Sequence, residues 1–196
     1  MSIPYESRGR AGQKARTRAT LVAAARELLR LGKMPTIEEV ADAAAISRPT
    51  AYRYFANQKA LLVAIQPNVA HVSLLGTSPP ADLERRLNKV AVSITQMVLD
   101  EEPALRAMLR LALNDDMSQP TDLPLRRGRR IAWIEDALEP LRGTLNPQEF
   151  RKLVLAIGMT LGIEALVWLT DVAGLSHEEA VKTMRWSARK LLNSML

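Results

Sequence analysis

Apolar residues recur at helical spacing along most of the chain, and prolines mark the places where that spacing is interrupted. Leu21, Ala25 and Leu29 set the pattern, because residues three and four apart lie on one face of a helix. Runs of β-branched residues are short, and the hairpin dipeptides Asn-Gly and Asp-Gly do not occur. The sequence therefore predicts an all-α chain of about nine helices: 16–31, short helices that begin after Thr36, Ser47 and Asn57, and then 81–99, 103–114, 124–141, 147–171 and 177–194.

Basic residues are concentrated in the first third of the chain. The 196 residues include 27 Lys and Arg against 21 Asp and Glu, which gives a formal net charge of +6. Residues 1–65 carry a net charge of +6, and residues 66–196 are neutral. This distribution indicates an anionic partner for the first third alone. The absence of cysteine excludes disulfides, thiolate metal clusters and a cysteine nucleophile, and we expect neither a metal nor a cofactor.

The segment from Thr36 to Phe55 has the pattern of a helix-turn-helix. Thr36-Ile37-Glu38-Glu39 is a capping box that begins one helix, and Ser47 can cap a second short helix after a tight turn. Pro49 is tolerated in the first turn of that helix, where no intrahelical N–H bond is lost. In this motif the second helix lies in the DNA major groove. A second capping box, from Ser176 to Glu179, predicts the start of the last helix.

The second short helix has two different sides. Ala51 and Phe55 suit the core, whereas Arg48 and Thr50 project elsewhere near the helix N-terminus and can reach base edges. Phosphate contacts suit the later side chains and the N-terminus of the preceding helix, where free amides favour an anion. The predicted DNA-binding residues are Thr36, Ser47, Arg48, Pro49, Thr50, Tyr52, Arg53 and Lys59, with Arg16 from the basic N-terminal segment.

Each of these features also has an interpretation without DNA. Helix-turn-helix geometry occurs in proteins that never bind nucleic acid, and a cluster of Arg and Tyr is often a solvated face. The basic residues from Arg8 to Arg18 are equally compatible with a solubilising tail and with contacts to phosphate or to a minor groove.

Lys14–Ile65 resembles the N-terminal DNA-binding domain of the tetracycline-repressor (TetR-type) family of bacterial transcriptional regulators. The resemblance covers 52 of 196 residues. It implies an all-helical homodimer, with a three-helix DNA-binding domain and an effector pocket among C-terminal helices. The matching motifs are the first apolar stripe, Thr36-Ile37-Glu38-Glu39-Val40-Ala41, Ile46-Ser47-Arg48-x-Thr50-x-Tyr52-Arg53-Tyr54-Phe55, and Asn57 with Ala60-Leu61-Leu62.

Four positions depart from the family pattern. Ala45 stands where the family usually has Gly in the turn, Pro49 replaces Gly or Ala, and Ala51 replaces a larger apolar residue. Gln58 stands where the family usually has a phosphate-contacting Lys, and Lys59 comes one place later. Whether Lys59 takes over that contact stays open at this point.

The predicted helices and the resemblance divide the chain into three parts. We expect a basic flexible arm over residues 1–13, a DNA-binding domain over 14–65 and an effector-binding and dimerisation domain over 66–196. The longest apolar stretch, Leu153–Leu169, contains Glu164 and is shorter than the roughly 20 residues that span a bilayer. It predicts a buried helix, and the expected location is the cytoplasm without a membrane partner.

The C-terminal candidates are less specific. Glu164 lies in the most apolar helix and requires a partner, which is either an intersubunit Arg or a cationic ligand. Gly158 and Gly162 let another helix approach, in a dimer or inside one subunit, and the Met and Trp candidates also suit a core. The candidate pocket residues are His71, Gln96, Met97, Met108, Trp133, Glu164 and Trp168, and the candidate dimer residues are Gly158, Gly162, Trp168, Met184 and Leu191.

These patterns favour a ligand-responsive transcriptional regulator. We expect a repressor that binds palindromic operator DNA as a homodimer and is released by a small-molecule effector. The alternative is a helical protein-interaction module or a sequence-independent DNA-binding module. An enzyme is not expected, because the chain has only two histidines, His71 and His177, and no Gly-x-Ser-x-Gly, phosphate-cradling Gly-rich or His-Glu-x-x-His motif.

Overall fold

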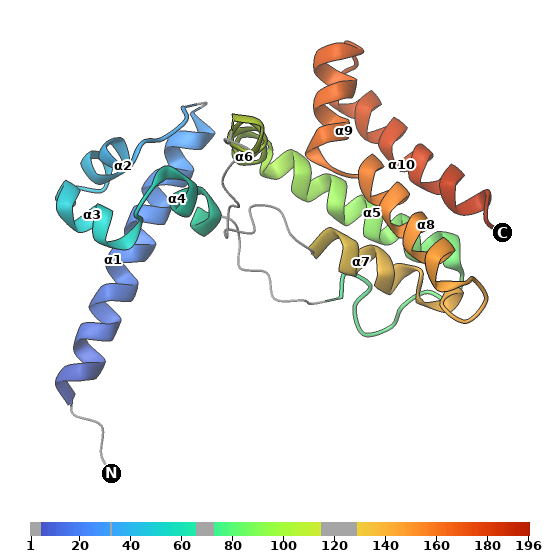
Figure 1. Ribbon diagram of the computed structural model, residues 1–196, viewed down its shortest axis with the longest axis horizontal. Coiled ribbons are helices and arrows are strands. Elements are labelled where there is room, and N and C mark those ends of the chain that lie inside the picture. The colour runs from blue at the N-terminus through green and yellow to red at the C-terminus, as the bar shows by residue number, and fades with distance from the viewer. Residues whose placement is uncertain (1–4, 32, 66–72, 115–128) are drawn as a thin grey trace. The chain divides into compact units, whose positions relative to one another are not determined.

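The structure is a computed structural model that describes residues 5–31, 33–65, 73–114 and 129–196 (Figure 1). These residues form ten α-helices, a 3-10 turn and a π-helical turn, and they contain no strand. The predicted all-α class is therefore confirmed. The chain divides into two compact units, an N-terminal one that includes residues 5–65 and a C-terminal one that includes residues 73–109 and 129–196. The end of the helix Glu102–Asn114, from Arg110 to Asn114, groups with the N-terminal unit.

The N-terminal unit consists of α1 (Tyr5–Arg30), α2 (Ile37–Ala43), α3 (Arg48–Tyr54) and α4 (Gln58–Ile65). Helix α1 packs against α2 and α4, and α2 packs against α3. The arginine at position 26 of α1 donates two hydrogen bonds to the carbonyl of Ile65, at 2.9 and 2.6 Å, and so caps the end of α4. The buried residues are Leu21, Ala25, Leu29, Ile37, Val40, Ala41, Ala51, Phe55, Leu61, Leu62 and Ile65.

Helix α1 begins at Tyr5, much earlier than the predicted start at residue 16. The predicted flexible arm over 1–13 is therefore wrong for residues 5–13, and residues 1–4 lie outside the described part. The apolar stripe begins only at Leu21, so apolar spacing gave no signal for the earlier turns. Those turns contain Ala, Arg, Gln and Lys, which favour a helix by intrinsic propensity.

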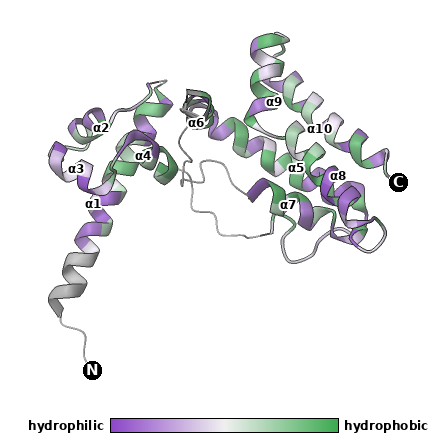
Figure 2. Ribbon diagram, in the orientation of Figure 1, coloured by the Kyte–Doolittle hydropathy of each residue, from purple (hydrophilic) through white to green (hydrophobic). Residues whose placement is uncertain are grey.

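The C-terminal unit contains the remaining elements. Helices α5, α7, α8 and α10 form its core, with α10 packed on α8 and α5, and α7 packed on the same two helices. Hydrophobic and hydrophilic residues alternate around α5 and α10 (Figure 2). The elements are α5 (Leu83–Asp100), α6 (Glu102–Asn114), α7 (Arg129–Ala137), the 3-10 turn η1 (Glu139–Leu141), α8 (Pro147–Thr160), α9 (Ile163–Val167), the π-helical turn η2 (Trp168–Val172) and α10 (His177–Asn193).

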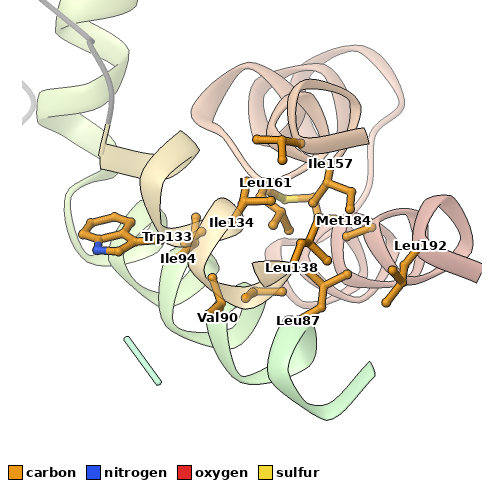
Figure 3. Packing of buried hydrophobic residues seen from close by; sticks show 14 of the residues in the cluster. Leu87, Val90, Ile94, Trp133, Ile134, Leu138, Ile157, Leu161, Met184 and Leu192 are labelled. Carbon is orange, nitrogen blue, oxygen red and sulfur yellow. The ribbon is translucent and has the colours of Figure 1, made fainter. Parts of the chain in front are cut away.

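Side chains from four helices interlock in the core of this unit (Figure 3). Ile134 of α7, Ile157 of α8 and Leu87 of α5 are at most 2% exposed. The core arginine Arg86 is 9% exposed and donates to the carbonyls of Asp136 and Ala137, at 2.7 and 2.9 Å. It therefore caps the C-terminus of α7 from a neighbouring helix, as Arg26 does for α4.

The predicted single helix over 147–171 is wrong, because it breaks between Thr160 and Ile163. Leu161 ends α8, and Gly162 begins α9 in an extended conformation. A Cβ atom on Gly162 would lie 1.7 Å from the Arg130 Nη1 atom, so the glycine leaves room for an arginine of α7. The predicted helix over 124–141 becomes α7 and η1, and residues 124–128 lie outside the described part.

Helix ends follow the capping residues in the sequence. Ser176 and Glu179 form the second predicted capping box, which begins α10 as expected. Asp82 caps α5 and Asn146 caps α8 through their side-chain oxygens. No single helix in the described residues is long and apolar enough to cross a membrane. Helix α8 and the following segment Ile163–Val172 meet that criterion only as a pair bent by 45°.

Candidate nucleic-acid interface

Helices α2 and α3 form the predicted helix-turn-helix. The hydroxyl of Thr36 accepts a hydrogen bond from the amide of Glu39 at 3.2 Å, and the Thr36 amide donates to the Glu39 carboxylate at 2.8 Å. The side chain of Gln58, on α4, donates to the carbonyl of Pro35 at 2.8 Å. These contacts fix where α2 begins.

The turn between α2 and α3 contains a residue in the left-handed region of backbone conformation. Ala45 has a φ of 52°, and the adjacent amides of Ala45 and Ile46 donate to the carbonyls of Asp42 and Ala41. A Cβ atom is unfavourable at this φ, which explains why glycine is the usual family residue here. The departure at Ala45 is thus accommodated with backbone strain rather than by a different turn.

Helix α3 presents one side to the core and one side to solvent, as predicted. Ala51 and Phe55 are 1% and 3% exposed. The N-cap residue Ser47 donates its hydroxyl to the Thr50 hydroxyl oxygen at 2.8 Å, and Pro49 lies in the first turn. The exposed residues of this segment are Ser47, Arg48, Pro49, Tyr52 and Arg53, with Thr50 partly exposed beside them.

Two acidic residues of α2 hold two of the predicted DNA-contacting residues of α3. The Arg48 guanidinium contacts the Asp42 carboxylate at 2.9 Å, and the Tyr52 hydroxyl donates to the Glu38 carboxylate. The hydrogen bond from Tyr52 lowers the pKa of Glu38, and the same bond raises the pKa of the Tyr52 phenol. All of these side chains are exposed or partly exposed.

The spacing of these four residues explains the contact. Glu38 and Asp42 are four residues apart on α2, and Arg48 and Tyr52 are four residues apart on α3. Each pair lies on one face of its helix, so two acids meet two hydrogen-bond donors across the turn. Neither acid was predicted from the sequence as an interface residue. The matching four-residue spacings are the signal that could have found them.

Two predicted basic contacts are accessible and have no carboxylate partner among the described residues. Arg53 lies with its guanidinium carbon 5.9 Å from the centroid of the Tyr54 ring. Arg16 is exposed on α1. Arg18, two residues along the same helix, lies 5.6 Å from the Phe55 ring centroid, next to the end of α3. These side chains supply positive charge that is not neutralised within the described part of the unit.

The structure disfavours two of the predicted phosphate contacts. Lys59 is 9% exposed, because it lies on the same face of α4 as the buried Leu62. At Thr36 the capping box already uses the hydroxyl and the amide, and Glu38 and Glu39 place negative charge in the first turn of α2. A carboxylate that already occupies a helix N-terminus competes with any incoming phosphate.

The candidate effector residues that the structure describes lie in different surroundings. Met108 and Trp133 are buried, at 1% and 8% exposed, and Met97 packs against the core. Figure 3 shows Trp133 beside the core residue Ile94. Gln96 is exposed and donates to Asp100. The remaining candidates are Glu164, which contacts Arg130 at 3.4 Å, Trp168, which is 59% exposed, and His71, which lies outside the described residues.

Most of the candidate dimer residues lie inside the subunit. A Cβ atom on Gly158 would lie 3.7 Å from the Ile134 Cδ1 atom, and Gly162 makes room for an arginine of α7, so both glycines serve packing within the unit. Met184 is 1% exposed, and Leu191 packs against the core. Of the five candidates, Trp168 alone is well exposed in this unit, and the other four are buried or partly buried within it.

A helix-turn-helix near the N-terminus of an all-helical chain is an arrangement that many DNA-binding proteins share. Residues 21–65 match the family described as "Bacterial regulatory proteins, tetR family". The chain is also similar to the crystal structure of a TetR transcriptional regulator from Rhodococcus sp. RHA1, at 20% sequence identity and a TM-score of 0.58, over 92% of this chain and 97% of that one. A comparison with curated proteins finds no significant match.

The family match falls on the segment whose motifs carry the resemblance, and the structural similarity extends the same fold over both units. The resemblance predicted from the sequence is therefore confirmed. The chain therefore resembles transcriptional regulators of the TetR type, by sequence over residues 21–65 and by fold over both units.

Proposed function

We propose that this chain is a repressor that binds palindromic operator DNA as a homodimer and is released by a small-molecule effector. Its site of action is the cytoplasm, and its role is regulatory rather than enzymatic. The observation that carries the proposal is the exposed side of α3, where Arg48 and Tyr52 are held in place next to Arg53, which has no carboxylate partner among the described residues. On the opposite side of the same helix, Ala51 and Phe55 are buried in the core.

The proposed DNA contacts follow from position along α3. Arg48 and Thr50 lie in its first turn and reach base edges, and an arginine can contact guanine with two hydrogen bonds. Tyr52 and Arg53 lie one turn later and contact phosphate. Arg16, on the solvated part of α1, contacts phosphate or a minor groove. Ser47 and Pro49 flank these residues at the edge of the interface.

The carboxylates of Glu38 and Asp42 increase the sequence specificity of this interface. On non-operator DNA they repel phosphates and keep Arg48 and Tyr52 engaged within the protein. On the operator a guanine edge replaces Asp42 as the partner of Arg48, and the hydrogen bonds lost within the protein are regained with DNA. The acids therefore penalise wrong sequences more than the right one.

We propose residues 14–65 as the DNA-binding domain and residues 66–196 as the effector-binding and dimerisation domain. The division of the chain into two compact units near this boundary supports the assignment. For the dimer we propose the exposed apolar residues of the C-terminal unit, Leu155 and Met159 of α8 with Trp168 and Val172 of η2, which are 41%, 73%, 59% and 70% exposed. A two-fold axis there would pair two recognition helices with two half-sites.

Selection of bound sequences from random duplex DNA tests the proposal. A two-fold dimer is expected to select two inverted half-sites whose centres are about 10 base pairs, or a multiple of that spacing, apart. A substitution at the proposed dimer face, Met159→Glu, is expected to abolish the inverted arrangement while leaving single half-site binding. If the bound duplexes share no sequence motif, the result would support the sequence-independent DNA-binding alternative. If no DNA is bound, the result would support a protein-interaction module.

A further inference from the structure

A groove of about 470 Å³ runs between the N-terminal half of α5 and the C-terminal half of α10. Its size is that of a small-molecule site. The buried Leu87, Ala91 and Ala188 form its apolar lining, and Trp186, which is 53% exposed, adds an aromatic surface. None of the predicted effector or dimer residues belongs to this groove. The polar lining residues are Asp82, Glu84, Arg85, Asn88, Lys182, Arg185 and Arg189.

The lining carries an excess of positive charge that its own acids do not neutralise. Four of the lining residues are basic and two are acidic. The carboxylate of Asp82 is used as the N-cap of α5, and Glu84 faces Arg189 at 3.6 Å. Lys182 contacts Glu178 at 2.6 Å. Among the described residues, this leaves Arg85 and Arg185 without a carboxylate partner.

Arg185 is the most constrained of these cations. Its Nε atom donates to the hydroxyl of the buried Thr95 at 2.8 Å, which orients the rest of the guanidinium. The side chain is partly buried, and this desolvation lowers the pKa of Arg185. A partly buried cation with one neutral hydrogen bond and no acid is unfavourable by itself, and an anion beside it removes that cost.

We propose that the groove between α5 and α10 binds a small planar aromatic monocarboxylate, whose carboxylate contacts Arg185 and Arg85 and whose ring packs on Trp186. The planar guanidinium fork matches a carboxylate with two parallel hydrogen bonds, and an indole ring packs against aromatic ligands. The two acids of the lining disfavour a polyphosphate or a nucleic acid, because a second negative charge on the ligand would be repelled. This site is separate from the proposed DNA contacts, and its test requires no DNA.

Titration calorimetry of the full chain with 2-naphthoate and with its neutral counterpart, 2-naphthamide, tests the site. We expect 2-naphthoate to bind at least tenfold more tightly than 2-naphthamide. The variant Arg185→Gln is expected to weaken 2-naphthoate at least tenfold and to leave 2-naphthamide unchanged, since a merely structural effect would weaken both. Trp186→Ala is expected to weaken both ligands. The matched control is Arg151→Gln on the exposed face of α8, which loses the same charge and is expected to change neither.

Three results would overturn the proposal: equal affinity for the acid and the amide, unchanged 2-naphthoate binding in both Arg185→Gln and Trp186→Ala, or displacement of 2-naphthoate by inorganic phosphate as readily as by benzoate. If Arg185→Gln fails to fold, the exposed Arg85→Gln replaces it. This variant is expected to weaken 2-naphthoate at least threefold and to leave 2-naphthamide unaffected, and unchanged 2-naphthoate binding would also overturn the site.

Discussion

The two units of the chain place their arginines in different surroundings. In the N-terminal unit, Arg48 contacts an acid six residues away, and both side chains are more than half exposed. In the C-terminal unit, Arg106 contacts Asp171, 65 residues away, and Arg86 caps α7 from 50 residues away. Exposed contacts within one motif leave side chains available for a partner. Contacts between distant and partly buried residues hold the core of a unit together.

These exposed and buried contacts also differ in how much they contribute to the free energy of unfolding. Exposed ion pairs contribute little, because water screens them and both side chains lose freedom. Buried hydrogen-bonding groups contribute more, because their loss leaves carbonyls without partners. The largest effects of substitution on stability are therefore expected in the C-terminal unit, and the largest effects on DNA binding in the N-terminal unit.

The substitution Arg86→Met is expected to have the largest effect on stability. It keeps much of the apolar stem and leaves the carbonyls of Asp136 and Ala137 without their donor, at a cost of about 3 kcal/mol. Denaturant unfolding measures the change. The matched variant is Arg26→Met, which removes the corresponding cap of α4 at the surface and is expected to cost about 1 kcal/mol. Equal costs for the two variants would contradict the contrast between the units.

A change of opposite sign is expected in the turn of the helix-turn-helix. Ala45→Gly relieves the strain of a Cβ atom at a φ of 52° and is expected to stabilise the chain by about 1 kcal/mol. The control is Ala43→Gly, two residues earlier at the end of α2, where φ is helical and glycine is expected to cost about 1 kcal/mol. Both are measured by denaturant unfolding. Destabilisation by Ala45→Gly would show that the turn is not strained.

The network around Arg106 makes a pH-dependent contribution. Hydrogen bonds from Arg106 and then from Thr170 lower the pKa of Asp171 from 3.8 to about 2. The stability that this carboxylate contributes is therefore fully present well above pH 3.8 and is lost as the pH falls through about 2. Asp171→Asn is expected to lower the urea midpoint at pH 7 and to flatten its fall between pH 4 and pH 2. Glu178→Gln, in an exposed pair with Lys182, is the control, and an equal effect there would remove the special role of Asp171.

A smaller effect is expected for the acid that holds Arg48. Asp42→Asn removes a negative charge close to the proposed DNA path, so affinity for non-operator duplex is expected to rise about threefold, as for one altered phosphate interaction. The ratio of operator to non-operator affinity is expected to fall. Fluorescence anisotropy with both duplexes measures the two affinities, and Asp100→Asn in the C-terminal unit is the charge-matched control. An increased ratio would contradict the role assigned to Asp42.

The predictions from sequence succeeded where contacts are local. The capping boxes at Thr36 and Ser176, the core side of α3 and the all-α class depend on residues within a few positions of one another. The start of α1 was missed because propensity, rather than an apolar stripe, supports its first turns. The burial of Lys59 was not expected, because its type indicates solvent, whereas its spacing from Leu62 indicates the core.

The surroundings of the C-terminal candidates could not be predicted from the sequence, for a different physical reason. Whether Gly158 faces another subunit or Ile134 depends on how α8 packs against α7, and no local pattern determines that. The same holds for the groove between α5 and α10, whose lining comes from segments about 100 residues apart in the sequence. Residue type identified candidates there, but long-range packing determined which of them are exposed.

The central claim is that the exposed side of α3 reads base sequence through Arg48. The most direct test is to select bound sequences from random duplex DNA with the native chain and with Arg48→Ala, using Arg142→Ala, outside both proposed interfaces, as the charge-matched control. The native chain and the control are expected to select the same inverted repeat. Arg48→Ala is expected to bind that repeat about 10 to 100 times more weakly and to lose the preference at one position in each half-site. An unchanged sequence preference in Arg48→Ala would contradict the account.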